Sequence, residues 1–75
     1  MRTRTILRSL GEEVRERRTQ RHWSQEKLAQ QAGIHTNVVG RLERGTYNPT
    51  VLTLLSIAVK LNVTLEELFR GAEAR

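Results

Sequence analysis

The sequence predicts an all-α domain of five short helices. Apolar residues recur at helical spacing along most of the chain, and no segment alternates in the way that a half-buried strand does. Residues that start or stop helices punctuate the chain at short intervals. Because 75 residues leave no room for a second domain, we expect residues 1–75 to form one domain, with a core over residues 10–69 and flexible ends at residues 1–4 and 71–75.

The first helix is expected from about Thr5 to Arg21. Its apolar residues share one face at helical spacing, and they are Ile6, Leu7, Leu10 and Val14. Gly11 interrupts this helix at a cost of roughly 1 kcal/mol relative to alanine. The helix therefore has an alternative start near Leu10, and residues 1–4 form a basic arm before it.

The second helix is expected over Gln25–Ala32, because the residues at both of its ends are typical of helix boundaries. The hydroxyl of Ser24 can accept a hydrogen bond from an amide of the first turn. Gly33 can end the helix in left-handed geometry. The side chains of Leu28 and Ala29 are expected in the core.

The third helix opens almost at once, at His35 or Thr36, and extends to Arg44, where Gly45 closes it. Its inward-facing residues are Val39 and Leu42. Two short helices joined by a tight turn that begins with glycine are typical of the helix-turn-helix motif.

The fourth helix is expected to start just behind Pro49, which the first turn of a helix tolerates, and to reach Leu61. The last helix begins with a capping box, in which Thr64 and Glu67 are three residues apart, and Gly71 stops it. It is expected to bury Leu65, Leu68 and Phe69.

The pattern of apolar residues in the fourth helix also predicts a contact surface. Its core-facing arc is formed by Val51, Leu54, Leu55, Ile57, Ala58 and Leu61, whereas Leu52 and Val59 lie together outside that arc. An exposed apolar pair indicates an interface, and we expect a homodimer through this pair together with Val63, Leu65 and Phe69. The alternative is that the pair has no partner, because single exposed leucines are common on protein surfaces.

The distribution of charge indicates an anionic partner. The formal net charge is +5 and the sequence pI is about 11.1. Residues 1–44 hold ten Lys and Arg against five Glu, whereas residues 45–75 hold three of each sign. One half of the domain is therefore basic, which favours a face that binds a polyanion over simple solvation of helix surfaces.

Several other classes of protein are excluded or disfavoured. The chain has no cysteine, which excludes disulfides and thiolate metal sites, and no cofactor is expected. His22 and His35 have no nucleophile or metal-ligating partner at a useful spacing, so an enzyme is improbable. The three aromatic residues are too few for an RNA-stacking platform. No signal peptide or membrane-spanning run is present, and a cytoplasmic protein is expected.

Several stretches together resemble the Cro/cI-type regulators of bacteria and phages, also called XRE-type. They are Val14–Arg18, Trp23–Ala29, Gly33–Ile34, Leu42–Gly45, Asn48–Thr50 and Ala58–Val63. The resemblance implies a five-helix, lambda-repressor-like domain that binds a palindromic operator as a homodimer. Within that family, the chain resembles both the Cro-like phage repressors and the restriction-modification controller proteins, and the run Gly33–Thr50 is especially similar to the controllers. Trp23 and Gly40 depart from the usual pattern, which has leucine and a longer side chain at these positions.

The recognition helix, residues 36–44, is expected to read bases with the side chains that the core does not use. Outward positions are Thr36, Asn37, Gly40, Arg41 and Arg44, and the resemblance assigns base contacts to Thr36, Asn37 and Arg41. Arginine can pair with guanine O6 and N7, asparagine with adenine N6 and N7, and threonine can contact thymine. Val38 either faces a thymine methyl or packs partly inward.

Contacts with DNA phosphates are expected on both sides of the recognition helix. The start of the second helix offers exposed amides and the positive end of a helix dipole. The predicted phosphate-binding residues are Ser24, Gln25, Arg44, Thr46, Tyr47 and Asn48. For Tyr47 and Asn48 the alternative is ordinary turn chemistry. The resemblance further implies that Arg18 and Glu43 form a partly buried ion pair that orients the recognition helix.

The predicted function is therefore sequence-specific binding of double-stranded DNA by a transcriptional regulator, with RNA polymerase as a further candidate partner. The alternative is an antitoxin that neutralises a toxin and also regulates its own promoter. Antitoxins commonly carry a toxin-binding segment beyond this domain, and only six residues follow Phe69. The sequence does not separate repression from activation.

Overall fold

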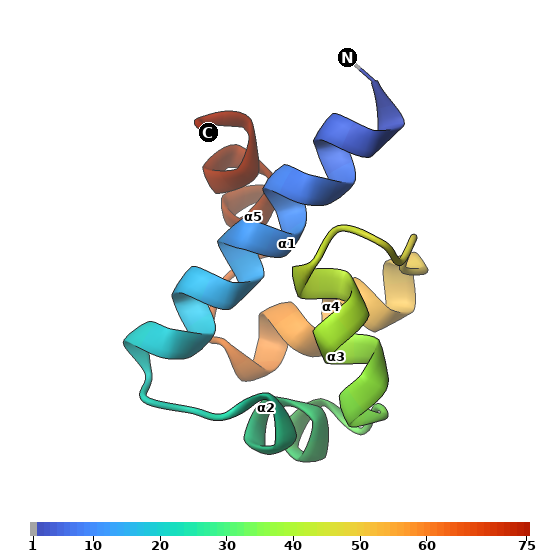
Figure 1. Cartoon of the computed structure of the whole chain (residues 1–75). Helices are drawn as coiled ribbons and strands as arrows, with labels where there is room; N and C mark the ends of the chain where they lie inside the picture. The colour runs from blue at the N-terminus through green and yellow to red at the C-terminus, as the bar shows by residue number, and fades with distance from the viewer. Residues whose placement is uncertain (1) are drawn as a thin grey trace.

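The computed structural model describes residues 2–75, which form five helices and no strand. In chain order these are α1 (Thr3–Gln20), α2 (Gln25–Ala32), α3 (Thr36–Glu43), α4 (Val51–Lys60) and α5 (Leu65–Glu73) (Figure 1). The predicted all-α class is confirmed. No helix in the described part of the chain is both long enough and apolar enough to span a membrane.

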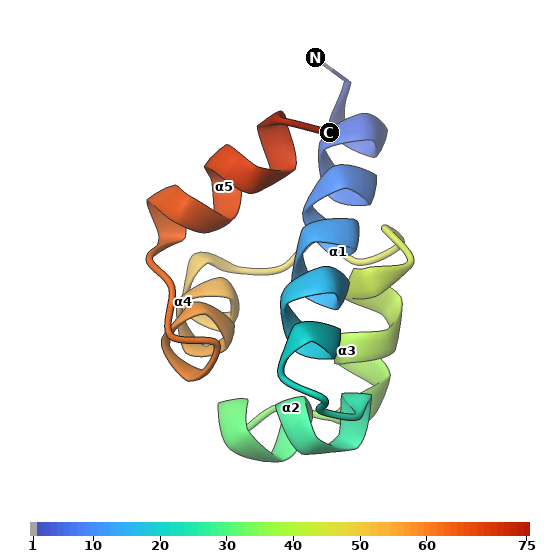
Figure 2. The same cartoon turned by 90° about the vertical axis from the view of Figure 1, so that its left-hand side faces the viewer.

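The longest helix, α1, lies between two others. Figure 2 shows α5 on one side of α1 and α3 on the other, and both helices contact it. The short helices α2 and α3 pack against each other below and beside α1, and α2 also contacts α4. The described residues extend over 31 × 21 × 21 Å.

The core draws buried apolar side chains from all five helices. Six of them are fully enclosed, and they are Val14, Leu28, Val39, Leu42, Ile57 and Leu68. Burying one such side chain contributes about 1.5–3 kcal/mol. Trp23, Ile34 and Tyr47 from the connecting segments pack against this core, so the loops that flank α2 and α3 are fixed to the same core as the helices.

Local capping defines the starts of three helices. The Ser24 hydroxyl accepts from the Lys27 amide at 3.0 Å, and Thr64 and Glu67 form the capping box of α5, so both predicted caps are confirmed. The hydroxyl of Thr50 accepts from the amide of Thr53 at 3.1 Å and caps α4. This cap was not predicted from the sequence, whereas the start of α4 just behind Pro49 is confirmed.

The predicted flexible ends need correction. Thr3 and Arg4 belong to α1, which therefore starts before the predicted Thr5, while Met1 lies outside the described residues. The helix α5 continues past Gly71 to Glu73. The carboxylate of Glu13 occupies the space where a Cβ at position 71 would lie, so this glycine makes room for an α1 side chain and does not end the helix.

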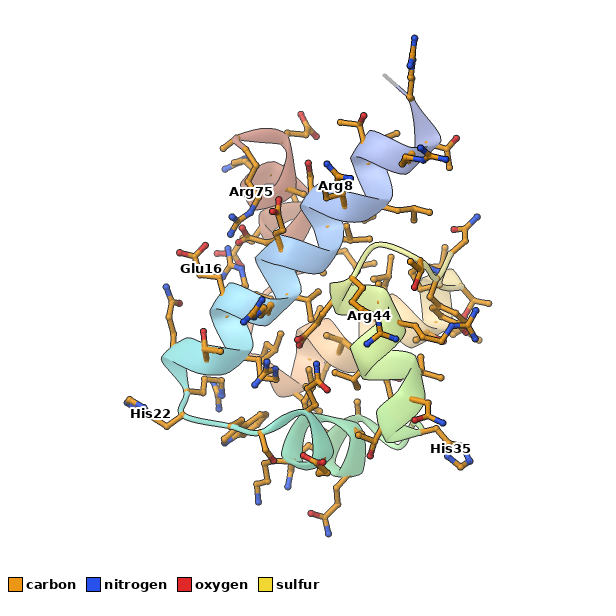
Figure 3. The ribbon with its side chains drawn as sticks, in the orientation of Figure 1. Arg8, Glu16, His22, His35, Arg44 and Arg75 are labelled. Carbon is orange, nitrogen blue, oxygen red and sulfur yellow. The ribbon has the colours of Figure 1, made fainter. Side chains whose placement is uncertain are left out.

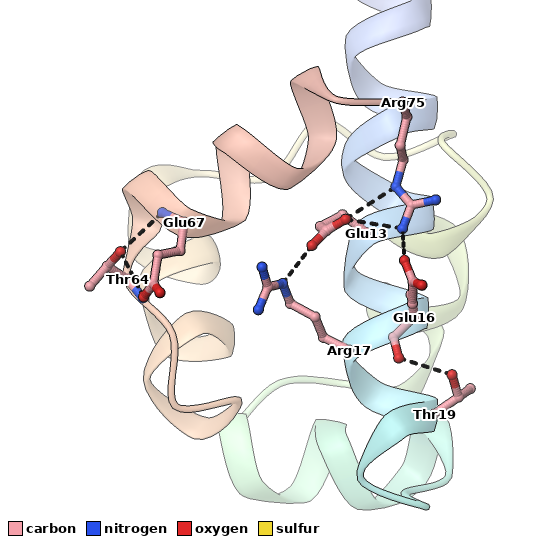
Figure 4. A network of polar contacts seen from close by, with 7 residues as sticks. All are labelled: Glu13, Glu16, Arg17, Thr19, Thr64, Glu67 and Arg75. Carbon is pink, nitrogen blue, oxygen red and sulfur yellow. Dashed lines mark hydrogen bonds and ion pairs between the residues drawn. The ribbon is translucent and has the colours of Figure 1, made fainter.

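Arg75 also contradicts the prediction of a free tail at residues 71–75. Its guanidinium donates to the Glu13 carboxylate at 3.0 and 3.2 Å and also pairs with Glu16 (Figure 4). Glu13 in addition accepts from Arg17 at 2.6 Å. This cluster of charged groups holds the end of α5 against α1.

Gly11 lies inside α1 at a close approach between helices. A Cβ at this position would meet the carbonyl oxygen of Leu42 and would lie 2.9 Å from the carbonyl oxygen of Glu43. The glycine therefore lets the end of α3 lie directly against the α1 backbone. The helix α1 runs without interruption through Gly11 from Thr3 to Gln20, so the alternative start near Leu10 is wrong.

The apolar arc of α4 is narrower than predicted. Val51 and Leu55, which were expected in the core, are 68% and 43% exposed. Leu52 and Val59 are exposed as expected, at 74% and 60%. Phe69 of α5 was expected to be buried and is 36% exposed. The surface therefore carries more apolar area than the sequence analysis predicted.

Candidate nucleic-acid interface

The turn between α2 and α3 sets the position of the outer α3 face. Gly33 has a φ of 71°, as predicted, and the amide of Ile34 donates to the carbonyl oxygen of Ala29 at 3.0 Å. Val39 and Leu42 point into the core and are fully buried. The opposite side of α3 is therefore presented outward.

That outward side forms a half-open hollow of about 270 Å³ between the start of α2 and the length of α3. Its lining residues are Gln25, Thr36, Asn37, Gly40, Arg41 and Arg44. The structure thus brings together Thr36, Asn37 and Arg41, the three residues that the resemblance assigned to base contacts. The half-buried Val38 does not line the hollow.

Gly40 lies on the outer face of α3, as predicted, and lines the hollow, but it is buried. A Cβ at this position would lie 3.3 Å from Nη1 of Arg44 and 3.5 Å from Oε1 of Gln25. The ends of these two side chains cover the glycine. Its missing side chain lets Gln25 and Arg44 come together over α3.

A buried polar network supports the hollow from below. Glu43 accepts from Nε and Nη2 of Arg18 at 2.7 and 3.0 Å, and Arg18 also donates to the carbonyl oxygen of Trp23 at 2.7 Å. The hydrogen bond with Glu43 raises the pKa of Arg18, with burial acting in the opposite direction. The pair joins α1 to α3, the geometry that the resemblance implied.

Gln25 is a third member of this network, a role that was not predicted from the sequence. Its Nε2 donates to Oε1 of Glu43 at 3.0 Å, which fixes the orientation of the side-chain amide. No local signal could have revealed this contact, because Gln25 and Glu43 are 18 residues apart. The second N–H of the amide makes no hydrogen bond within residues 2–75.

The segment after α3 holds Arg41 in place. The guanidinium of Arg41 lies over the ring of Tyr47, 5.4 Å from its centroid, and the hydroxyl of Thr46 donates to the Arg41 carbonyl oxygen at 3.1 Å. Tyr47 also packs against the core, so it is more than a solvated loop residue. Asn48 is exposed.

The chemistry of this face is cationic and donor-rich. The ion pairs formed by residues 2–75 use Arg17, Arg18, Arg70 and Arg75, so the exposed Arg41 and Arg44 keep their charges available. No group of three or more potential metal ligands occurs in the described part of the chain. Such a face can bind an extended anion, and guanidinium groups suit phosphate and guanine equally.

The five predicted interface residues divide into two sets. Leu52, Val59 and Phe69 are exposed, whereas Val63 and Leu65 are half-buried and pack against the core. The exposed apolar residues of α4, namely Val51, Leu52, Leu55 and Val59, follow one another at the i, i+1, i+4 and i+8 spacing of a single helix face. We call this face the α4 apolar stripe.

Comparison with known proteins gives concordant matches. A family model described as "Helix-turn-helix" matches residues 14–68. The chain is 40% identical over 58 residues to the HTH-type transcriptional regulator SutR of Escherichia coli, a match that covers 77% of this chain and 33% of SutR. The chain thus spans about a third of that relative. It is 39% identical over 63 residues to the control protein C.SmaI of Serratia marcescens, covering 84% of this chain and 75% of C.SmaI.

Solved structures agree with these matches. The restriction-modification controller protein C.AhdI of Aeromonas hydrophila superposes with a TM-score of 0.81 at 37% identity, over 83% of this chain and 94% of C.AhdI. The clp gene regulator ClgR of Corynebacterium glutamicum superposes with a TM-score of 0.88 over 92% of this chain and 73% of ClgR. The latter match has 20% identity and supports the fold alone.

Proposed function

The chain belongs to the helix-turn-helix family of DNA-binding transcriptional regulators, and on that premise we propose that it binds a palindromic operator as a homodimer, with α3 in the major groove. One observation carries the proposal. The hollow over Gly40 gathers two exposed arginines, an asparagine, a threonine and a glutamine on the outer face of α3. A helix with such a face fits the major groove of B-DNA, where base edges are distinguishable.

Arg41, Asn37 and Thr36 are the proposed base readers. Arg41 suits guanine, because its guanidinium can donate to O6 and N7 together, and Asn37 suits adenine. The Tyr47 ring beneath Arg41 limits the positions of the guanidinium, with a cation–π contribution of about 0.5–1 kcal/mol at an exposed site. We assign Val38 at most a methyl contact with thymine, because it is half-buried.

The proposed phosphate contacts divide according to which donors are available. The Ser24 hydroxyl accepts from the Lys27 amide and can still donate its own O–H. We therefore assign the phosphate to this hydroxyl, to the amides of the first α2 turn and to the second side-chain N–H of Gln25. After α3, the side chains of Arg44 and Asn48 are exposed. Thr46 donates to α3 itself, which makes it a positioning residue in this proposal.

The α4 apolar stripe is the proposed centre of the homodimer interface, with Phe69 beside it. Four exposed apolar residues on one helix face exceed the scattered leucines that a monomer surface normally carries. A two-fold dimer would present two recognition helices about 34 Å apart, one turn of DNA. One protomer would read one half-site, and the dimer would read both halves of the operator.

Among regulators, we favour a restriction-modification controller. Two of the matches carry such names, the control protein C.SmaI at 39% identity and the restriction-modification controller protein C.AhdI at 37% identity. SutR, at 40% identity, is named only as a transcriptional regulator. All three are named as regulators or control proteins and none as an enzyme. Expression of the chain beside restriction and methyltransferase genes, with a promoter reporter, would test this subtype.

Selection of bound duplexes from a random DNA pool tests the proposed function. The expected result is one enriched sequence with two-fold symmetry and half-sites about one helical turn apart. A consensus without symmetry would refute the dimer on a palindrome. A pool that shows no enrichment would refute sequence-specific binding.

A further inference from the structure

The exposed surface of α1 separates its charges by side. At 100° per residue, Arg4, Arg8 and Arg15 fall within an arc of about 40° that begins next to Gly11, the residue that touches the end of α3. The glutamates Glu12 and Glu16 lie beyond that arc, toward α5. We call the three arginines the α1 arginine flank.

The flank keeps its charge. Arg4, Arg8 and Arg15 are exposed and take part in none of the ion pairs within residues 2–75. The carboxylates of Glu13 and Glu16 are instead engaged by Arg17 and Arg75 on the α5 side of the helix, as Figure 4 shows. Glu12 is also exposed and reduces the net charge of this surface by one.

The flank adjoins the recognition helix. A Cβ at Gly45 would lie 2.9 Å from the Cα of Arg8, so the chain just after Arg44 rests on the α1 backbone at Arg8. In Figure 3, Arg44 lies on the α3 side of α1, whereas Glu16 and Arg75 lie on the opposite side. The basic surface of α3 therefore continues through Arg44 onto the α1 arginine flank.

We propose that the α1 arginine flank binds phosphates of the duplex beside the half-site that α3 reads, so that each protomer covers more DNA than its helix-turn-helix motif alone. This inference rests on the proposed function. Arginine is well suited to the role, because its guanidinium is always charged and can donate two parallel hydrogen bonds to phosphate. Such contacts fix register and raise affinity for every sequence, without reading bases.

The contribution of Arg8 can be measured through salt dependence. The binding constant K falls as the salt concentration rises, and each phosphate contact makes the slope of log K against log salt concentration more negative by about 0.9. Fluorescence anisotropy with the selected operator and with an unrelated duplex, between about 50 and about 200 mM salt, gives this slope. For Arg8→Ala we expect a slope shallower by about 0.9 per protomer. The ratio of the wild-type binding constant to that of Arg8→Ala should therefore fall about threefold per protomer as the salt concentration rises over this range.

Three controls separate the effect of a phosphate contact from other effects. Arg8→Lys keeps the charge and should restore most of the slope. Arg70→Ala removes an exposed arginine from α5 and should leave the slope unchanged. The selected consensus should be the same for Arg8→Ala as for wild type, because phosphate contacts carry no sequence information.

Two results would overturn the inference, and they are distinguishable from failure of the proposed function. An Arg8→Ala slope equal to that of Arg70→Ala, with specific binding retained, would remove the flank from the interface. A changed consensus for Arg8→Ala would make Arg8 a base reader. If wild type itself bound no duplex specifically, the proposed function would fail first.

The location of the contact has its own test. We expect wild type to lose affinity when base pairs outside the consensus are trimmed from the operator duplex. A variant that carries Arg4→Ala, Arg8→Ala and Arg15→Ala together should be insensitive to the same trimming. Equal sensitivity of both proteins would contradict a contact beside the half-site.

Discussion

Replacement of Glu43 by alanine should sharply destabilise the domain, because the residue is 8% exposed and accepts three hydrogen bonds. Two come from Arg18 and one comes from Gln25. In Glu43→Ala the Arg18 guanidinium keeps only the Trp23 carbonyl oxygen as partner, while its side chain is 10% exposed. The substitution therefore leaves a nearly buried charge without a directly bonded counter-charge.

The expected loss is about 3–5 kcal/mol in the free energy of unfolding, the cost of removing one partner from a buried ion pair. A domain of this size has a total stability of about 4–11 kcal/mol, from about 0.05–0.15 kcal/mol per residue. The loss is thus a large part of the whole. An exposed ion pair, by contrast, contributes only about 0–1 kcal/mol to the free energy of unfolding, so its removal costs little.

Urea unfolding followed by far-ultraviolet circular dichroism measures this loss, at one fixed protein concentration because dimerisation would contribute to apparent stability. Glu66→Ala is the matched control, since Glu66 pairs with Arg70 and its side chain is 79% exposed. The double variant Arg18→Met/Glu43→Leu should recover much of the stability, because neither charge remains. A loss for Glu43→Ala no larger than that for Glu66→Ala would refute the reasoning.

Three further predictions concern other parts of the molecule. Arg41→Ala should weaken operator binding by about 1–3 kcal/mol and relax base preference at one position of each half-site; an equal loss on all duplexes, measured by anisotropy, would make Arg41 a phosphate contact. Leu52→Glu should shift the protein toward monomer in sedimentation equilibrium, whereas an unchanged dimer would place the interface elsewhere. The backbone and side-chain hydrogen bonds of Thr64 lower the pKa of Glu67, so its carboxylate stabilises the fold above the ordinary value of 4.5, and this contribution disappears as the pH falls through the lowered pKa. Wild type should therefore lose more unfolding free energy than Glu67→Gln over that fall, and parallel acid titrations of the two proteins would contradict this.

Local signals in the sequence predicted the helix-turn-helix region best. Ser24, Gly33 and Gly45 act within one helical turn of their own position, so capping rules fix the bounds of α2 and nearly fix those of α3. The same holds for the Thr64–Glu67 capping box. The outward residues of α3 followed from the positions that the core uses.

Contacts between distant segments could not be predicted in this way. Gly71 looked like a helix stop, but its role depends on the carboxylate of Glu13 in another helix. Likewise, the role of Gly40 depends on where the ends of Gln25 and Arg44 lie. The exposure of Val51 and Leu55 depends on how the other helices cover α4, which a helical wheel does not contain.

The central claim is that α3 reads the major groove of a two-fold-symmetric operator. Methylation interference tests it most directly, because methylation at guanine N7 blocks the major groove and methylation at adenine N3 blocks the minor groove. We predict interference by N7-methylguanine at symmetric positions in two half-sites about one helical turn apart. Interference confined to adenine N3, or confined to one half of the site, would contradict it.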